Sequence, residues 1–170
     1  ISPQTTRFGL TVAENRQPFF INDWRSSFGP VFNGFPMFFW LFFIGSIYLF
    51  NNLIKNLNKK ERLILTLSYT VFLVCLIFSR YSSNSILDGV SGFSLLVYSF
   101  GWLFFIGSFG YFYYERYNEN GLSIFKTLEF NYIFYFVVLT LAIIGARAGI
   151  RLIMVLGAVS PVVIAFLIVK

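Results

Sequence analysis

Two arginines near the end of the sequence, Arg147 and Arg151, stand four positions apart in the otherwise apolar stretch ARAGIRLIMVLGAVSPV (146–162). Residues with this spacing share one face of a continuous helix. Arginine side chains are planar forks that match phosphate oxygens with pairs of hydrogen bonds. The pair therefore suggests a phosphate site at a membrane surface. The alternative is that both side chains reach lipid headgroups from the end of a span.

A single carboxylate, Glu14, lies near the other end of the sequence in TVAENRQPFF (11–20). The residues Thr11, Val12 and Ala13 before it favour an extended backbone. Such a segment can run beside another extended peptide and hydrogen bond to its backbone. Glu14 is therefore a candidate for chemistry on a bound peptide. The alternative is a solvated or ion-paired surface charge.

The composition excludes several other kinds of site. The sequence has no histidine, which removes the commonest proton shuttle and the commonest transition-metal ligand. The one cysteine, Cys75, can form neither an internal disulfide nor a metal cluster, so we interpret it as a small buried hydrophobe. The net charge of +6 is spread thinly between apolar segments, so nucleic acid is not an expected partner.

The elements that would position the candidate residues are helices that span a membrane. Of the 170 residues, 57% are apolar and only 12% are charged, about half the charged fraction of an average soluble domain. A span needs about 20 mostly apolar residues. The segments that qualify are 36–54, 63–79, 93–114, 131–147 and 151–169. We predict an all-α, polytopic transmembrane helix bundle at 36–170, preceded by an external loop at 1–35.

The last two predicted spans could instead form one long helix. Such a helix would be about 58 Å long, nearly twice the hydrocarbon thickness of about 30 Å, so a hairpin is favoured. Positive residues in short loops indicate the cytoplasmic side, and the loop at 51–62 holds four of them. Alternation then places the segments 1–35, 80–92 and 147–151 together on the extracytoplasmic side of a cell membrane. Glu14 and both arginines should share that side.

Taken together, two stretches resemble the catalytic subunit of oligosaccharyltransferase, the enzyme that N-glycosylates asparagine. TVAENRQPFFINDWRSSFGP (11–30) resembles the family's Thr/Ser-Ile/Val-x-Glu motif on its fifth external loop, with the Gln-Pro and the Trp-Ser-Phe-Gly-Pro-type approach to the next helix. The stretch at 146–162 resembles the family's arginine-led helix, of the form Val-Arg-Leu-Met-Leu-x-Leu-x-Pro-Val. The bundle would then be part of a GT-C-type glycosyltransferase membrane domain.

The resemblance implies a role for each candidate residue. Glu14 would be a catalytic residue that ligates a divalent metal ion, Mn²⁺ or Mg²⁺, and helps to hold the acceptor asparagine amide. Arg151, with Arg147 nearby, would bind the pyrophosphate of the lipid-linked oligosaccharide. The residues that would bind the acceptor peptide are Thr11, Val12, Ala13 and Glu14.

The implied reaction moves an oligosaccharide as a block from its lipid carrier to the asparagine of an Asn-x-Ser/Thr sequon in an acceptor polypeptide. An amide nitrogen is a poor nucleophile because its lone pair is delocalised, so the site must orient it. A hard cation held by carboxylates, together with arginine, neutralises the departing pyrophosphate. The abundance of Phe, Ile, Asn and Lys without histidine suggests an archaeal source and a dolichol-type carrier.

The sequence departs from the family pattern in two respects. The family has fewer spans between the glutamate and the arginine helix than the five found here. An additional pair of spans near 63–114 explains the difference, and because it is a pair, Glu14 and Arg151 stay on the same side of the membrane. The acidic Asp-x-Asp-type motifs of the family's first external loops and its Trp-Trp-Asp sequon pocket are absent. One glutamate cannot build a metal site, so we expect this stretch to be inactive by itself.

Two other functions stay open. Another glycosyltransferase that uses polyprenyl-phosphate sugars would have the same architecture but would not respond to an Asn-x-Thr peptide. A transporter or membrane scaffold would use Arg147 and Arg151 to line a pathway or to anchor headgroups. That function would need charged residues or broken helices near the middle of the bilayer, and the predicted spans contain almost none.

Overall fold

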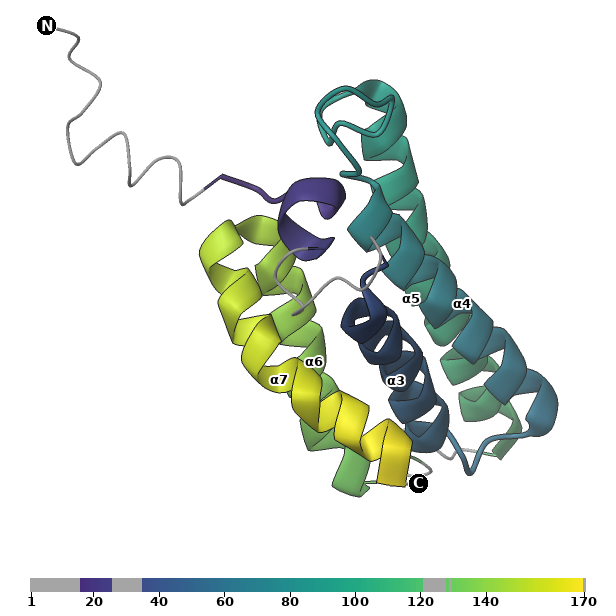
Figure 1. Ribbon diagram of the computed structural model, residues 1–170. Coiled ribbons are helices and arrows are strands. Elements are labelled where there is room, and N and C mark those ends of the chain that lie inside the picture. Colours follow the sequence, from purple (N-terminus) through teal and green to yellow (C-terminus); the bar gives the residue numbers. More distant parts are fainter. Residues whose placement is uncertain (1–15, 26–34, 121–127, 129, 170) are drawn as a thin grey trace, which may run out of the picture.

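The computed structural model describes residues 16–25, 35–120, 128 and 130–169. The helices within them are η2 (Phe20–Trp24, a π-helical turn), α3 (Met37–Leu53), α4 (Lys59–Phe78), α5 (Gly92–Asn120), α6 (Phe130–Ala148) and α7 (Ile150–Val169) (Figure 1). Each predicted apolar segment coincides with one α-helix. The all-α prediction is confirmed.

Three of the helices, α4, α5 and α7, are long and apolar enough to cross a membrane. The apolar helices α3 and α6 are shorter. Many large hydrophobic side chains are exposed, among them Leu96, Leu103, Leu141 and Met154. Such a surface suits lipid rather than water. These features indicate a membrane protein, while the number of five spans stays a prediction.

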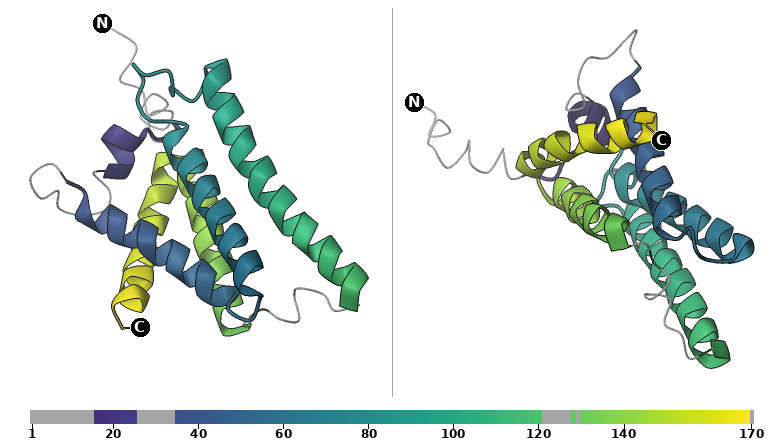
Figure 2. Two further views of the ribbon diagram at one scale, coloured as in Figure 1. Left: turned by 90° about the vertical axis from the view of Figure 1, so that its right-hand side faces the viewer. Right: turned by 90° about the horizontal axis from the view of Figure 1, so that it is seen from below.

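Helix α3 lies at the centre and contacts α4 on one side and the α6–α7 pair on the other, while α5 runs along the outside of α4 (Figures 1 and 2). Glycines permit two of the close approaches. A Cβ on Gly45 would lie 3.0 Å from the carbonyl oxygen of Val163, and one on Gly101 would lie 2.5 Å from Cβ of Cys75. Small residues allow helix backbones to pack closely where the solvent is lipid.

Aromatic rings from four helices fill the interior of the bundle. Tyr69 and Phe50 stack with ring centroids 4.4 Å apart, and Phe105 and Phe136 each lie within 6 Å of both rings. The buried hydroxyl of Tyr69 shares a hydrogen bond of 2.8 Å with Oγ of Ser46. The polar group is thus satisfied inside an apolar core.

The predicted hairpin between the last two apolar segments is confirmed. Helix α6 ends at Ala148 and α7 begins at Ile150, with Gly149 between them. The prediction that Arg147 and Arg151 share one helix face is wrong, because the chain reverses between them. Arg147 belongs to the last turn of α6 and Arg151 to the first turn of α7.

Candidate functional site

The segment 16–25 lies across one end of the bundle, next to the α4–α5 connection and the α6–α7 turn (Figure 1). The backbone N–H of Phe20 donates to the carbonyl of Arg80 at 2.9 Å, and the N–H of Ile150 donates to the carbonyl of Arg16 at 3.1 Å. Three segments that are far apart in the sequence therefore meet at the same end. This grouping agrees with the prediction that the segments 1–35, 80–92 and 147–151 lie on the same side of the membrane.

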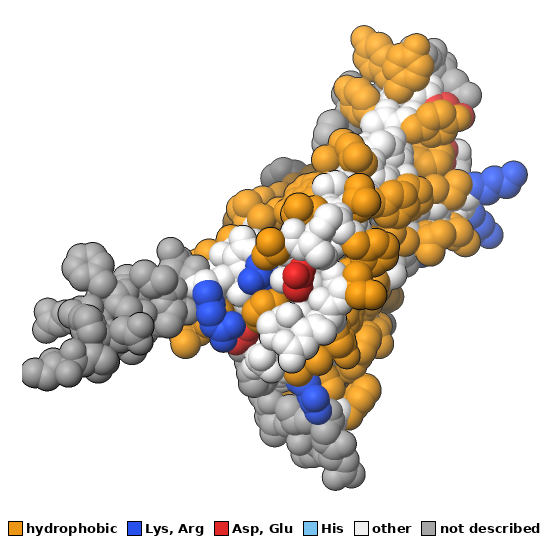
Figure 3. Space-filling model, turned by 90° about the horizontal axis from the view of Figure 1, so that it is seen from above, with side chains coloured by type: hydrophobic (Ala, Val, Ile, Leu, Met, Phe, Trp, Pro, Cys, Tyr) orange, Lys and Arg blue, Asp and Glu red, His pale blue; other side chains and the backbone are white. Residues whose placement is uncertain are grey.

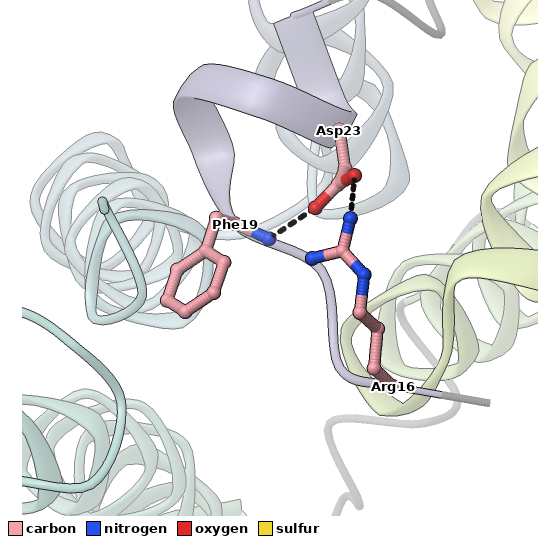
Figure 4. Close-up of polar contacts among 3 residues, drawn as sticks. All are labelled: Arg16, Phe19 and Asp23. Atoms are coloured by element: carbon pink, nitrogen blue, oxygen red, sulfur yellow. Dashed lines mark hydrogen bonds and ion pairs between the residues drawn. The ribbon is translucent and has the colours of Figure 1, made fainter. Parts of the chain in front are cut away.

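The segment 16–25 is held in shape by Asp23. Its carboxylate accepts the N–H of Phe19 at 2.8 Å and pairs with Arg16 at 2.9 Å (Figure 4). A carboxylate that accepts an unpaired N–H at the start of a helical turn stabilises that turn. Phe20 and Trp24 of the same turn are buried against the bundle. The segment is therefore a fixed part of the fold.

Two guanidinium groups converge on Gln17. Nη1 of Arg80 donates to Oε1 of Gln17 at 2.6 Å, and Nη1 of Arg147 donates to the same oxygen at 3.3 Å. Arg147 also donates to Oγ of Ser79 at 3.5 Å and lies over the ring of Tyr98, 5.5 Å from its centroid. All of these partners are neutral. Two cations thus meet with an amide, not a carboxylate, between them.

No ion pair neutralises the two guanidinium groups of this cluster, although the carboxylates of Asp88 and Asp23 lie near enough to act on Arg80. Within the part of the chain that the structure describes, neither Arg80 nor Arg147 forms an ion pair, and the Nε atom of each is buried without a hydrogen-bond partner. Burial lowers the pKa of Arg80, and the nearby charge of Arg16 lowers it further. The carboxylates of Asp88 and Asp23 raise this pKa but do not cancel the effect of burial. The guanidinium stays protonated at any physiological pH. The cluster is therefore suited to an anion.

A cavity of about 270 Å³ opens beside Arg147 and beside Gln17, the residue to which Arg80 also donates. Gln17, Gly89, Ser94, Tyr98 and Arg147 contribute to its walls. One water molecule needs only about 10–15 Å³ by a comparable measure, so the cavity has room for a larger polar group. Seen from this end of the molecule, acidic and basic side chains lie among hydrophobic ones (Figure 3).

The α4–α5 connection shapes the side of the site that carries Arg80. Asp88 accepts the N–H groups of Ser91 and Val90 at 2.7 and 2.8 Å, and these bonds lower its pKa. Gly89 has a φ of +84°, and a Cβ there would lie 2.6 Å from Cγ of Arg80. Only glycine adopts this backbone conformation without strain and also leaves room for the arginine.

The structure describes two of the predicted site residues. Arg147 lies in the cluster, and Arg151 is exposed at the start of α7 at the same end of the bundle. The predicted residues outside the described part of the chain are Thr11, Val12, Ala13 and Glu14. Sequence reasoning missed Arg80 and Gln17, whose side chains meet across 63 positions. No periodicity or motif signals that contact.

The described residues do not provide a metal site. They include no group of three or more Cys, Asp or Glu that could hold a metal ion. The expected Mn²⁺ or Mg²⁺ therefore depends on Glu14, which lies outside the described residues. A single carboxylate does not complete a site for a hard cation.

Comparison of the chain with models of protein families, with curated proteins and with solved structures finds no match. The functional conclusion therefore rests on the site. Its described residues can bind an oxyanion through two guanidinium groups and neutralise negative charge that develops on it. The hydroxyl of Tyr98 at the cavity adds further hydrogen-bonding capacity, whereas that of Ser94 already donates to the carbonyl of Ser79 and accepts the N–H of Gly89.

Proposed function

We propose that this chain is part of a membrane glycosyltransferase that transfers an oligosaccharide from a lipid pyrophosphate carrier to the asparagine of Asn-x-Ser/Thr sequons. The observation that carries the proposal is the pair Arg80 and Arg147, two cations that share Gln17 and form no ion pair among the described residues. Arg147 and Gln17 also line a cavity at the end of the apolar bundle. A lipid pyrophosphate presents its anion where membrane spans end. The resemblance to oligosaccharyltransferase supplies the acceptor class.

In this proposal, Arg80 and Arg147 bind the oxygens of the pyrophosphate. The bond between the anomeric carbon and the phosphate oxygen breaks, and its electron pair leaves with the pyrophosphate. The asparagine nitrogen forms the new bond to the anomeric carbon and loses a proton, which passes to the released pyrophosphate or to water. Because negative charge grows on the leaving group during this step, fixed guanidinium groups stabilise the transition state more than the ground state.

The acceptor side of the proposal rests on Glu14. Arg16, two positions later in the sequence, is tied to the α6–α7 turn by the bond from Ile150 to its carbonyl. This tie supports a site at which the peptide-binding stretch and the arginines work together. Glu14 would orient the asparagine amide and would be one ligand of the expected metal ion. Arg151, exposed at the same end, would make a second contact with the carrier.

Because this stretch is expected to be inactive by itself, the test places the full-length protein that contains it in lipid nanodiscs with a lipid-linked oligosaccharide, Mn²⁺ and a fluorescent Asn-x-Thr peptide, and follows glycosylation by gel shift. We expect a shifted peptide with the wild type and none with Glu14→Gln. Arg147→Gln should lower kcat/KM for the donor about 10- to 100-fold, the range for loss of a charge-assisted hydrogen bond. Lys55→Gln removes a positive charge at the opposite end and should leave kcat/KM unchanged.

Each variant is checked for folding by thermal unfolding. Absence of transfer with every carrier tested would contradict the proposal. Transfer to an acceptor other than the Asn-x-Thr peptide would indicate another glycosyltransferase that uses polyprenyl-phosphate sugars. Equal activity of the wild type and Glu14→Gln would show that Glu14 is an ordinary surface charge with no role in transfer.

A further inference from the structure

A second groove lies between α3 and α4, at the end of the bundle opposite the two-arginine cluster, with a volume of about 710 Å³. Its two ends differ in chemistry. Lys59 and Arg62, in the first turn of α4, line one end. Exposed apolar side chains, Ile44 of α3 and Leu63 and Leu67 of α4, line the groove further along. The groove is thus cationic at the end of the helices and apolar toward their middle.

The length of the groove matches one leaflet of a bilayer. Its lining on α4 extends from Lys59 to Thr70, which is about 16 Å at 1.5 Å per residue. The hydrocarbon core of a bilayer is about 30 Å thick, so the groove reaches from the headgroups to about the middle. Thr66 and Thr70 donate their hydroxyls to carbonyls one turn earlier in α4, at 2.8 Å each. These hydroxyl protons are therefore already used within the helix.

The cations at the end of the groove retain hydrogen-bonding capacity. Arg62 donates through Nε to Oδ1 of Asn51 at 2.6 Å, its one side-chain hydrogen bond with the described residues. Its two terminal amino groups can therefore serve another acceptor. Lys59 is exposed and forms no ion pair within the described part of the chain. The nearby carboxylate of Glu61 is paired with Arg116 of α5 at 2.9 Å, so its charge is already engaged.

We propose that this groove binds one anionic phospholipid, with its phosphate on Lys59 and Arg62 and an acyl chain along Ile44, Leu63 and Leu67. Basic pockets between helices on the cytoplasmic side bind anionic headgroups, and an arginine fork matches phosphate oxygens. The groove opens at the loop 51–62, whose four positive residues predict that side. This inference is independent of the proposed glycosyltransferase activity, because it concerns the opposite end of the bundle.

The test titrates the protein in detergent with phosphatidylglycerol or with phosphatidylcholine of the same acyl chains, and counts retained lipids by native mass spectrometry. We expect preferential retention of phosphatidylglycerol. Lys59→Gln and Arg62→Gln should each weaken it about fivefold, since one basic residue near a membrane surface contributes about that factor. Lys60→Gln is the matched control, because Lys60 is an exposed neighbour with the same charge that does not line the groove.

A further variant, Leu67→Trp, fills the apolar wall while keeping both cations, and should also lose retention. Thermal unfolding verifies that each variant is folded. Equal weakening by Lys60→Gln would assign the effect to diffuse surface charge and overturn the proposal. So would equal retention of phosphatidylcholine, or no retained lipid at all. Glycerol phosphate is the probe for a soluble phosphate, and its displacement of the lipid at comparable concentration would overturn the assignment to a phospholipid.

Discussion

Arg80 and Arg147 donate to one shared oxygen, Oε1 of Gln17, although they come from the α4–α5 connection and the end of α6. Contacts with aromatic rings offset part of the repulsion between these two positive charges. The guanidinium of Arg80 lies 4.5 Å from the ring centroid of Phe19, and that of Arg147 lies 5.5 Å from that of Tyr98. Attraction to the ring faces holds both cations without neutralising them. The charge therefore stays available to a ligand.

Gln17→Glu should increase stability and reduce donor use. A carboxylate between two guanidinium groups would form ion pairs, for which we expect a gain of up to about 1 kcal/mol at this exposed position. The same carboxylate would compete with the pyrophosphate and raise the KM for the lipid-linked donor by up to about fivefold, the factor that corresponds to about 1 kcal/mol. Thermal unfolding and donor titration measure the two effects. Gln17→Leu is the control, since it should lower stability. If both variants change stability in the same direction, the charge argument is wrong.

Gly89→Ala should disturb Arg80 through the backbone. Alanine at a φ of +84° is strained by about 1–2 kcal/mol, and its Cβ would meet the Arg80 side chain at 2.6 Å. We expect lower thermal stability and a higher KM for the donor. Gly92→Ala is the control, because a Cβ there meets no atom within 4 Å. Unchanged donor use in a folded Gly89→Ala protein would show that the turn does not position Arg80.

Asp88→Asn should destabilise the α4–α5 connection in a manner that depends on pH. Backbone hydrogen bonds from Ser91 and Val90 lower the folded-state pKa of Asp88 below its ordinary value of 3.8. The stabilisation is therefore fully present above that value and is lost as the pH falls through the lower folded-state pKa. Thermal unfolding from pH 7 to pH 3 should show a difference between variant and wild type that shrinks only at the acid end. A constant difference would contradict this account.

Gly101→Ala should weaken the packing of α5 on α4. A Cβ at Gly101 would lie 2.5 Å from Cβ of Cys75, which cannot move without shifting a helix. Overpacking of this kind costs about 1–3 kcal/mol, which a shift of the unfolding midpoint in detergent would report. Gly107→Ala is the matched control in the same helix, since its Cβ would have no neighbour within 4 Å. If the two substitutions shifted the unfolding midpoint equally, helix propensity rather than packing would account for the change in stability.

The helices could be predicted because the length of an apolar run is nearly sufficient to define a span. The same reasoning favoured a hairpin between the last two apolar segments, and α6 does end at Ala148, just before α7 begins at Ile150. The prediction that Arg147 and Arg151 share a helix face is wrong because the hairpin turn lies between them. A spacing of four positions defines a face only in a helix that continues through it.

The candidate site was predictable only in part. Arg147 was a candidate because it stands four positions before Arg151 in a stretch that resembles the family's arginine-led helix. Arg80 also follows an apolar run, at 63–79, but nothing in the sequence links it to Arg147 or to Gln17. Their contact depends on the backbone bond from Phe20 to Arg80, which joins residues in different parts of the chain. Contacts of this kind are set by tertiary packing and leave no local pattern in a single sequence.

Gln17 and Arg147 are 130 positions apart in the sequence, so they are synthesised at different times. A ribosome adds about 5–20 residues per second, so Arg147 leaves it roughly 6 to 26 s after Gln17. During that interval the segment that crosses the end of the bundle has its α4–α5 neighbours at most, and the α6–α7 turn does not yet exist. The two-arginine cluster therefore cannot close before α6 has been synthesised. A nascent chain stalled before α6 would contain Gln17 and Arg80 but would lack Arg147, the second cation of the proposed anion site.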